Sequence, residues 1–228
     1  MVSVPNFDHD FDFDPTYGYS QQQLEALIPP AGPNDFDAFW TETRQVAMDL
    51  PLDIRREELT SSVDHRIVEK VSFTTMDGIQ VAGWLTRPKN QPATHAWLVG
   101  HGYGGREAPD LAPNDNAVRY FLCAPGFHLS AAPDLPDNSG AHVIHGIASK
   151  ETYLIRHCVA SMWQAITVIQ KLCPELSWIG YDGTSFGGGL GALMLPWEDR
   201  LQAAYIGQPT FGNHPIRLQC KCVGSGES

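Results

Sequence analysis

The sequence lacks any apolar run long enough to cross a membrane. A bilayer-spanning helix needs about 20 consecutive apolar residues, and no stretch of the chain approaches that length. The first residues, Met-Val-Ser-Val-Pro-Asn-Phe-Asp, also have neither the basic start nor the apolar segment of a secretory signal peptide. We therefore expect a cytoplasmic protein with no membrane partner.

Basic residues are also few. The chain has 15 Lys and Arg against 26 Asp and Glu, which gives a formal net charge of −11. Such a surface repels nucleic acid and anionic lipid, so neutral or cationic small molecules are the expected ligands. The rest of the composition, 43% hydrophobic and 18% charged, is typical of a globular domain that buries a sizeable core.

Cysteine is sparse and its spacing fits neither a disulfide framework nor zinc. The five cysteines are odd in number, lie mostly in apolar stretches and show no Cys-x-x-Cys pair, which indicates buried reduced thiols. They are Cys123, Cys158, Cys173, Cys220 and Cys222. Asp8, His9 and Asp10 resemble a metal cluster, but an extended N-terminal arm with solvated aspartates explains them better. We expect no metal and no cofactor.

The first predicted element is a helix that follows a proline-rich breaker at residues 29–33. Asn34 or Asp35 can cap this helix. Its apolar positions are Phe36, Phe39, Trp40 and Met48. We expect residues 1–60 to form an N-terminal arm and accessory helix packed on a core domain that occupies residues 61–228.

Strand patterns and helix patterns then alternate along the chain. Residues 66–87 alternate in polarity around Asp77 and Gly78, which predicts a β-hairpin. The apolar runs at 95–100 and 118–124 are typical of strands buried on both faces of a parallel sheet. The remaining predicted elements are a helix at 151–172, a strand at 177–181, a helix at 187–195 and a strand at 203–207. This order predicts an α/β fold with a mostly parallel central sheet flanked by helices.

The most specific motif is Gly183-Thr184-Ser185-Phe186-Gly187, which falls between a predicted strand and a predicted helix. G-x-S-x-G in that context is the nucleophile elbow of α/β-hydrolases, a turn so tight that the flanking residues must be small. It presents Ser185 as a nucleophile and aims helix N-terminal amides at the reacting carbonyl, so we expect the Phe186 amide to be one oxyanion donor. A glycine-rich turn that serves only close helix–sheet packing is the alternative.

A second oxyanion donor must come from a loop after an earlier strand. The segment His-Gly-Tyr-Gly-Gly-Arg at 101–106 directly follows the apolar run at 95–100. We expect the amide of Gly102 or Tyr103 to complete the oxyanion hole. Tyr103 and Arg106 are also candidates for substrate binding, while anchoring of the loop is an equally good explanation of Arg106.

The motif does not identify the catalytic base. Partners of an elbow serine follow it in the order acid, then histidine, so His101 is expected to orient the loop by hydrogen bonds. Glu198, Asp199 and His214 follow Ser185 too closely in the sequence to be expected as the missing partners.

Several short segments of the sequence, taken together, match the pattern of one known protein family. They are Asp-Phe-Asp-Ala-Phe-Trp at 35–40, Gly-Trp-Leu at 83–85, Gly-Tyr-Gly-Gly-Arg at 102–106, His-Gly-Ile at 145–147, Glu-Thr-Tyr at 151–153 with Arg156, and Ser-Phe-Gly-Gly-Gly at 185–189. Together they resemble the acetyl xylan esterase and cephalosporin C deacetylase family of α/β-hydrolases. The resemblance implies cofactor-free deacetylation of small acetylated sugars and cephalosporin C-like acetates by a cytoplasmic enzyme, with family members forming hexamers.

The chain departs from this family in two respects. Phe186 stands where well-known members have glutamine, and because the donor is a backbone amide, we expect an altered pocket wall and an unaltered mechanism. In the family, the Asp and the His lie in late strands and loops that find no counterpart here. We therefore expect an incomplete α/β-hydrolase, lacking the last strands and helices, that is inactive or weak alone.

Two other interpretations stay open. One is a non-catalytic esterase fragment or pseudoenzyme that serves as a binding module. The other is a dienelactone-hydrolase-like or serine-peptidase-like α/β-hydrolase, which shares the elbow but lacks the surrounding segments.

Overall fold

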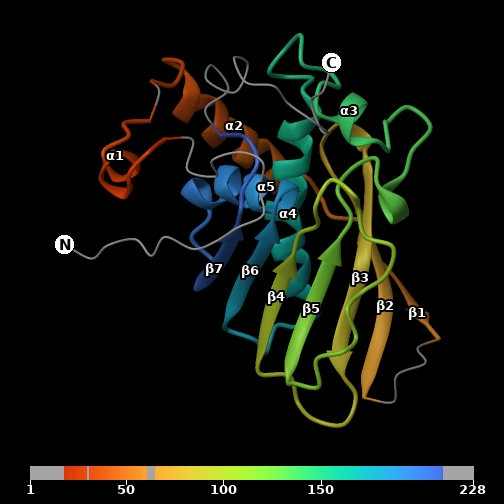
Figure 1. The fold of residues 1–228 in the computed structure, drawn as a ribbon. Coiled ribbons are helices and arrows are strands. Elements are labelled where there is room, and N and C mark those ends of the chain that lie inside the picture. The colour runs from red at the N-terminus through yellow and green to blue at the C-terminus, as the bar shows by residue number, and fades with distance from the viewer. Residues whose placement is uncertain (1–17, 30, 61–64, 213–228) are drawn as a thin grey trace. The chain divides into compact units, whose positions relative to one another are not determined.

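The computed structural model describes residues 18–29, 31–60 and 65–212 (Figure 1). Its contacts divide the chain into two compact units, with the boundary between Asn34 and Asp35. This boundary lies earlier than residue 60, where the sequence pattern placed it. In the first unit, a short helix α1 (Gln21–Glu25) starts with a capping box, in which Ser20 and Gln23 exchange side chain-to-backbone hydrogen bonds.

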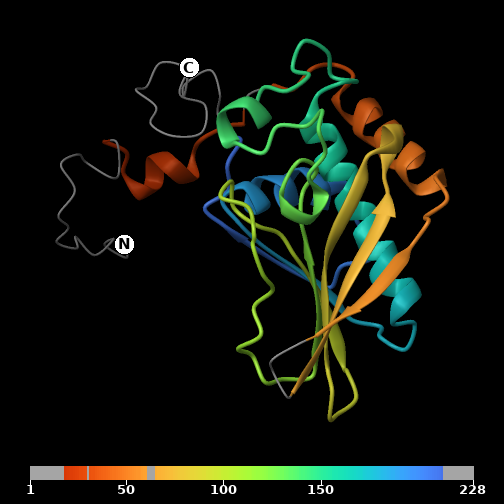
Figure 2. The same ribbon diagram turned by 90° about the vertical axis from the view of Figure 1, so that its right-hand side faces the viewer.

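The second unit is built on a seven-stranded sheet with strand order β1-β2-β3-β5-β4-β6-β7 (Figures 1 and 2). The strands are β1 (Arg55–Leu59), β2 (Arg66–Thr74), β3 (Gln80–Pro88), β4 (His95–Val99), β5 (Ala117–Leu122), β6 (Ile179–Thr184) and β7 (Ala203–Gly207). β1, β2, β3 and β5 pair antiparallel, whereas β5, β4, β6 and β7 pair parallel. The predicted α/β class is confirmed.

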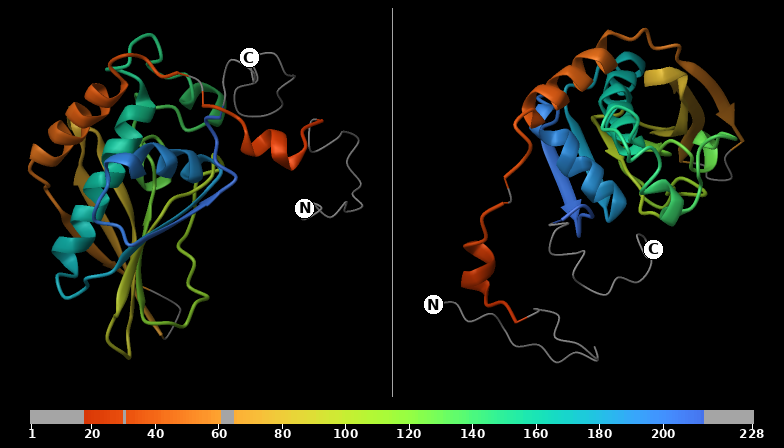
Figure 3. Two further views of the ribbon diagram at one scale, coloured as in Figure 1. Left: turned by 90° about the vertical axis from the view of Figure 1, so that its left-hand side faces the viewer. Right: turned by 90° about the horizontal axis from the view of Figure 1, so that it is seen from above.

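Helices cover one face of this sheet, as the left view of Figure 3 shows. The helices of this unit are α2 (Phe36–Asp49), α3 (Ser139–His142), α4 (Leu154–Leu172) and α5 (Phe186–Met194). α4 is buried along most of its length and packs between the sheet and α2, with Trp40 of α2 edge-on to Trp163 of α4. α2 begins at the predicted position, although Asp35 caps it without a side-chain hydrogen bond. α4 begins three residues later than predicted.

The opposite face carries a smaller apolar cluster and the loop from β4 to β5, which runs down that side of the sheet (Figure 2). The buried members of the cluster are Val68, Trp84, Val99, Phe121 and Cys123. No helix of the described residues packs over β6 and β7 on this face, and Tyr205 of β7 is 61% exposed. Within the described part of the chain, the parallel end of the sheet is therefore uncovered on this face.

The predicted hairpin and the predicted thiols are both present. β2 and β3 pair in antiparallel register and turn through Asp77 and Gly78, whose φ angles of 56° and 78° lie in the left-handed region. Cys123, Cys158 and Cys173 are free and buried, whereas Cys220 and Cys222 lie outside the described residues. No described helix is long and apolar enough to span a membrane.

Candidate active site

Ser185 lies at the predicted strand-to-helix turn, between the end of β6 and the start of α5. Its φ of 55° and ψ of −117° are unusual for a residue with a side chain, and such backbone strain costs about 1–3 kcal/mol. Hydrogen bonds on both sides hold it. The Ser185 N–H donates to Gly207 O at 2.9 Å, and the Ser185 carbonyl accepts from the N–H groups of Gly189 at 2.9 Å and Thr210 at 3.1 Å.

Glycines let the turn approach its neighbours closely. A Cβ added to Gly183 would lie 2.6 Å from the carbonyl oxygen of Gly187, and one added to Gly187 would lie 3.1 Å from the backbone of Gly100 and His101. The N–H of Gly187 also donates to the carbonyl of His101 at 2.8 Å. The elbow is therefore joined directly to the loop after β4.

That loop brings the predicted oxyanion residues beside the nucleophile. A Cβ placed on Gly102 would lie 3.8 Å from Ser185 Cβ. The N–H groups of Gly102, Tyr103 and Phe186 donate to no other backbone group among the described residues. The structure thus gathers Ser185, Phe186, Gly102 and Tyr103, as the sequence predicts, and leaves their catalytic roles as predictions.

His101 has both ring nitrogens engaged. Nδ1 lies 2.7 Å from the carbonyl oxygen of Gly102, and Nε2 lies 2.9 Å from the N–H of Ala124. Because a carbonyl accepts and an amide donates, the proton sits on Nδ1 and Nε2 is the acceptor. Burial lowers the pKa of His101 to about 4. The ring is neutral and orients the loop, as predicted, and it has no nitrogen free to serve as a base.

An aromatic cluster that the sequence analysis missed borders the nucleophile. The Tyr103 ring stacks on the Phe186 ring with centroids 4.0 Å apart, and His142 and Phe127 contact both rings. The Tyr103 hydroxyl is buried and has no hydrogen-bond partner among the described residues. Burial raises the pKa of Tyr103 far above its ordinary value, so the hydroxyl stays protonated. Local motifs singled out Tyr103 and Phe186 but gave no signal for their contact.

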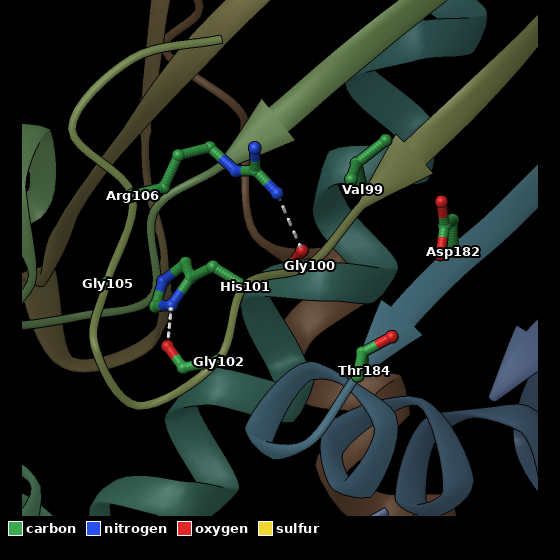
Figure 4. A pocket seen from close by; sticks show the side chains of 8 residues that line it. All are labelled: Val99, Gly100, His101, Gly102, Gly105, Arg106, Asp182 and Thr184. Atoms are coloured by element: carbon green, nitrogen blue, oxygen red, sulfur yellow. Dashed lines mark hydrogen bonds between the residues drawn. The ribbon is translucent and has the colours of Figure 1, made fainter. Parts of the chain in front are cut away.

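A polar cavity of about 430 Å³ adjoins the elbow (Figure 4). Arg106, from the loop after β4, and Asp182 and Thr184, from the end of β6, line it together with Gly102. The Arg106 guanidinium donates to Gly100 O at 3.3 Å and lies 4.8 Å from the centroid of the Phe121 ring. Arg106 therefore anchors the loop and also lines a cavity, and its role in substrate binding stays a prediction.

The carboxylates downstream of the elbow lie away from Ser185. Helix α5 carries the chain roughly 13 Å from Ser185 at 1.5 Å per residue. Glu198, beyond its end, is buried and paired with Arg200 at 2.6 Å, and Asp199 is exposed and lies 3.5 Å from Arg44. His214 lies outside the described residues. Among the residues described, none donates to or accepts from the Ser185 hydroxyl, and no three metal-ligating side chains cluster.

The sheet order and the strand-to-helix turn at Ser185 are those of the α/β-hydrolase fold. The family model Acetyl xylan esterase (AXE1) matches residues 24–121 of the chain. The resemblance drawn from the sequence is confirmed over those residues. A search of curated proteins finds no match to the chain.

Solved structures show the same fold. The crystal structure of acetyl xylan esterase 1 from a Thermoanaerobacterium species matches with a TM-score of 0.77 and 20% identity, over 88% of this chain and 67% of its own. An acetyl xylan esterase from a Paenibacillus species matches with a TM-score of 0.75 and 19% identity, over 90% of this chain and 69% of its own. The chain thus spans about two thirds of the length of each.

Proposed function

We propose that the protein is a serine carboxylesterase that removes acetyl groups from small esters, with Ser185 as the nucleophile. The observation that carries the proposal is the strained Ser185 backbone at the start of α5, which hydrogen bonds to Gly207, Gly189 and Thr210 hold in place, while the Gly187 N–H joins the elbow to the glycine-rich loop at His101 O. Such strain persists only where the surrounding structure enforces it, and it is frequent at reactive residues. The match to the acetyl xylan esterase family supports the choice of acetyl esters.

The reaction follows the order expected of a serine nucleophile. Ser185 Oγ forms a bond to the acetyl carbonyl carbon while its proton passes to a base, and the carbonyl oxygen becomes an oxyanion. The backbone N–H of Phe186 and that of Gly102 or Tyr103 stabilise this charge. The C–O bond to the alcohol then breaks, the base returns its proton to the leaving oxygen, and water releases acetate from the acetyl-serine.

The base and the acid that orients it are not supplied by the described residues. We propose that an Asp and a His outside these residues complete the triad, because about a third of each similar esterase structure has no match in this chain. Without them, the oxyanion hole and substrate binding leave roughly 10³-fold acceleration over water. A chain that lacks both partners should therefore be a weak esterase.

The proposed substrates are acetylated xylo-oligosaccharides and cephalosporin C-like acetates. Tyr103 lies in the loop that adjoins the elbow, and Phe186 directly follows Ser185, so we propose that their stacked rings limit the acyl group to a short one. No cofactor enters any of these steps.

Acetyl transfer to Ser185 tests the proposal on the chain as it exists. The chain is incubated with p-nitrophenyl acetate, with and without imidazole as an external base, and the mass of the peptide that contains Ser185 is measured. Because p-nitrophenolate is a far better leaving group than the serine alkoxide that deacylation must expel, acylation should outpace deacylation. The acetyl-enzyme should therefore accumulate, and imidazole should accelerate its formation. Ser185→Ala should abolish the added acetyl group, and Ser177→Ala, at an exposed serine, should not.

A non-catalytic binding module is the second candidate. It is favoured by the absence, among the described residues, of a hydrogen-bonded base at the Ser185 hydroxyl. A folded chain in which Ser185 stays unacetylated even with imidazole would support this candidate over the esterase.

A further inference from the structure

The segment that follows β7, residues 207–211, contacts the backbone of Ser185 on two sides. β7 lies next to β6 in the sheet and pairs with it as far as Thr184 and Gly207 (Figure 1). Just beyond the end of β6, the Ser185 N–H donates to the carbonyl of Gly207 at 2.9 Å, and the Ser185 carbonyl accepts from the N–H of Thr210 at 3.1 Å. Both polar backbone groups of the nucleophile are therefore bonded to this one segment.

The two groups of the segment that bond Ser185 are a natural pair. Gly207 and Thr210 stand three positions apart, and in a closed turn the carbonyl of the first such residue accepts from the N–H of the second. In this structure each of these groups bonds to Ser185 instead. Ser185 therefore satisfies a donor and an acceptor that would otherwise be free to pair with each other.

Unusual backbone conformations are concentrated in the same place. Of the five non-glycine residues with positive φ in the described part of the chain, three are Ser185, Gln208 and Phe211, with φ angles of 55°, 42° and 68°. Gln208 also precedes Pro209, and a residue before proline normally favours extended backbone. Such conformations persist only where the surrounding structure enforces them. Because the Gln208 side chain is exposed, we assign this enforcement to the backbone bonds on either side of it.

Helix α5 leaves the room that the segment needs. A Cβ added to Gly189 would lie 2.6 Å from Thr210 Oγ1 and 2.5 Å from Phe211 Cδ2. The ring of Phe211 in turn lies edge-on to that of Phe186, with centroids 6.1 Å apart. The segment is therefore packed closely against the first turn of the helix that carries the elbow.

We propose that residues 207–211 position the nucleophile, and that the left-handed backbone of Gln208 directs Gly207 O and the Thr210 N–H to Ser185. Gln208 is then a positioning residue, since it acts on the reaction only through Ser185. Its effect on catalysis rests on the proposed function. The bonds to the Ser185 backbone do not, because they form without any reaction.

Substitutions of Gln208 test the proposal, because residues differ in how readily they adopt a positive φ. Glycine adopts it at no steric cost and asparagine readily, whereas valine, which is branched at Cβ, strongly disfavours it. With imidazole present, Gln208→Val should lower the maximal rate at which p-nitrophenyl acetate acetylates Ser185 about tenfold, since a small displacement of a nucleophile slows the chemical step. The half-saturating ester concentration should not change. Gln208→Gly and Gln208→Asn should retain the wild-type rate.

Asp77→Val is the matched control. Asp77 is also left-handed, with a φ of 56°, but it lies in the turn between β2 and β3. The nearer of these strands is three strand spacings from β6, or about 14 Å. This variant should be less stable than the wild-type chain, while its folded molecules should be acetylated at the wild-type rate. The comparison separates a general loss of stability from an effect on the nucleophile.

Amide hydrogen exchange measures the bonds from residues 207–211 independently of any reaction. The N–H groups of Ser185 and Thr210 should exchange about tenfold faster in Gln208→Val, while those of β4 and β5 should keep their wild-type rates and show that the fold is intact. Unchanged exchange at Ser185 and Thr210, or an unchanged rate of acetylation, would overturn the positioning role. Faster exchange in Gln208→Val, combined with a wild-type chain that is never acetylated, would support the bonds to Ser185 and overturn the proposed esterase activity alone.

Discussion

The ring of Tyr103 stacks on the ring of Phe186, with centroids 4.0 Å apart and planes inclined by 17°. One ring belongs to the loop after β4 and the other to the first turn of α5, so the contact ties the two proposed sources of oxyanion N–H groups together. Phe186 is 1% exposed. The residue that departs from the glutamine of well-known relatives is therefore a structural contact of the site.

Removing the Phe186 ring should destabilise the protein and weaken the connection between the loop after β4 and helix α5. Phe186→Ala should lower the free energy of unfolding by about 3–5 kcal/mol, as for other buried phenylalanines. A double-mutant cycle with Tyr103→Ala should give a coupling of about 1 kcal/mol. Denaturant unfolding measures both. Phe36→Ala, at a position 40% exposed, is the control and should cost far less.

The Phe186 ring should also determine the length of acyl group that the site accepts. If Phe186 walls the acyl site, Phe186→Leu should raise the rate of butyryl transfer to Ser185 relative to acetyl transfer by about tenfold, the usual effect of making room for methylene groups. Mass spectrometry of the Ser185 peptide after reaction with the two p-nitrophenyl esters gives the ratio. An unchanged ratio in a folded variant would place the acyl group elsewhere.

Backbone strain at Ser185 predicts an unusual response to glycine. Its φ of 55° suits glycine, so Ser185→Gly should relieve strain that Ser185→Ala retains. Glycine also loses more chain entropy on folding, which offsets part of the gain. The glycine variant should still be more stable than the alanine variant by about 1 kcal/mol. The reverse order in denaturant unfolding would show that the turn is not strained.

Local patterns predicted most of the sheet. The strand expected at 203–207 matches β7, and the hairpin and the strands at 95–100 and 118–124 are confirmed within two residues, because apolar runs and alternation are local signals. The sequence predicts a strand at 177–181, whereas β6 begins at Ile179 and extends to Thr184. Its polar, glycine-containing end resembles a turn in sequence, whereas in the fold it is the strand end that carries the elbow.

What the sequence could not predict depends on distant partners. β1 reads Arg-Arg-Glu-Glu-Leu, without alternation, and forms because it pairs with β2 at the sheet edge. The elbow and its loop were each predicted from short motifs. The cavity between Arg106 and Asp182 was not, because two separate strand ends bring these residues together.

Burial of His101 predicts a pH dependence of stability. In the unfolded chain the imidazole titrates near its ordinary pKa of 6.5, whereas the folded protein lowers this pKa to about 4. Between these values the unfolded state binds the proton and the folded state does not, so stability is complete above pH 6.5 and declines as the pH falls toward 4. The loss should reach about 3 kcal/mol. In denaturant unfolding across this range, His101→Asn should show a shallower decline, and an unchanged slope would contradict this account.

Glu69 of β2 provides the last prediction, which concerns the edge strand. Its buried carboxylate lies 2.7 Å from Arg56 of β1 and 2.6 Å from Arg87 of β3, so one charge joins three neighbouring strands. Glu69→Gln keeps the shape but leaves two guanidinium groups facing a neutral amide. Because the two arginines left without a carboxylate are 39% and 35% exposed and stay partly solvated, the variant should lose about 1–2 kcal/mol of unfolding free energy.

The location of that loss is as informative as its size. Amide hydrogen exchange in Glu69→Gln should accelerate first in Arg55–Leu59, since β1 is held by the sheet on one side only. Glu57→Gln, at an exposed position of the same strand, is the matched control and should change stability by less than about 0.5 kcal/mol. Equal exchange rates in the two variants would show that backbone pairing with β2, rather than the charge of Glu69, fixes β1 to the sheet.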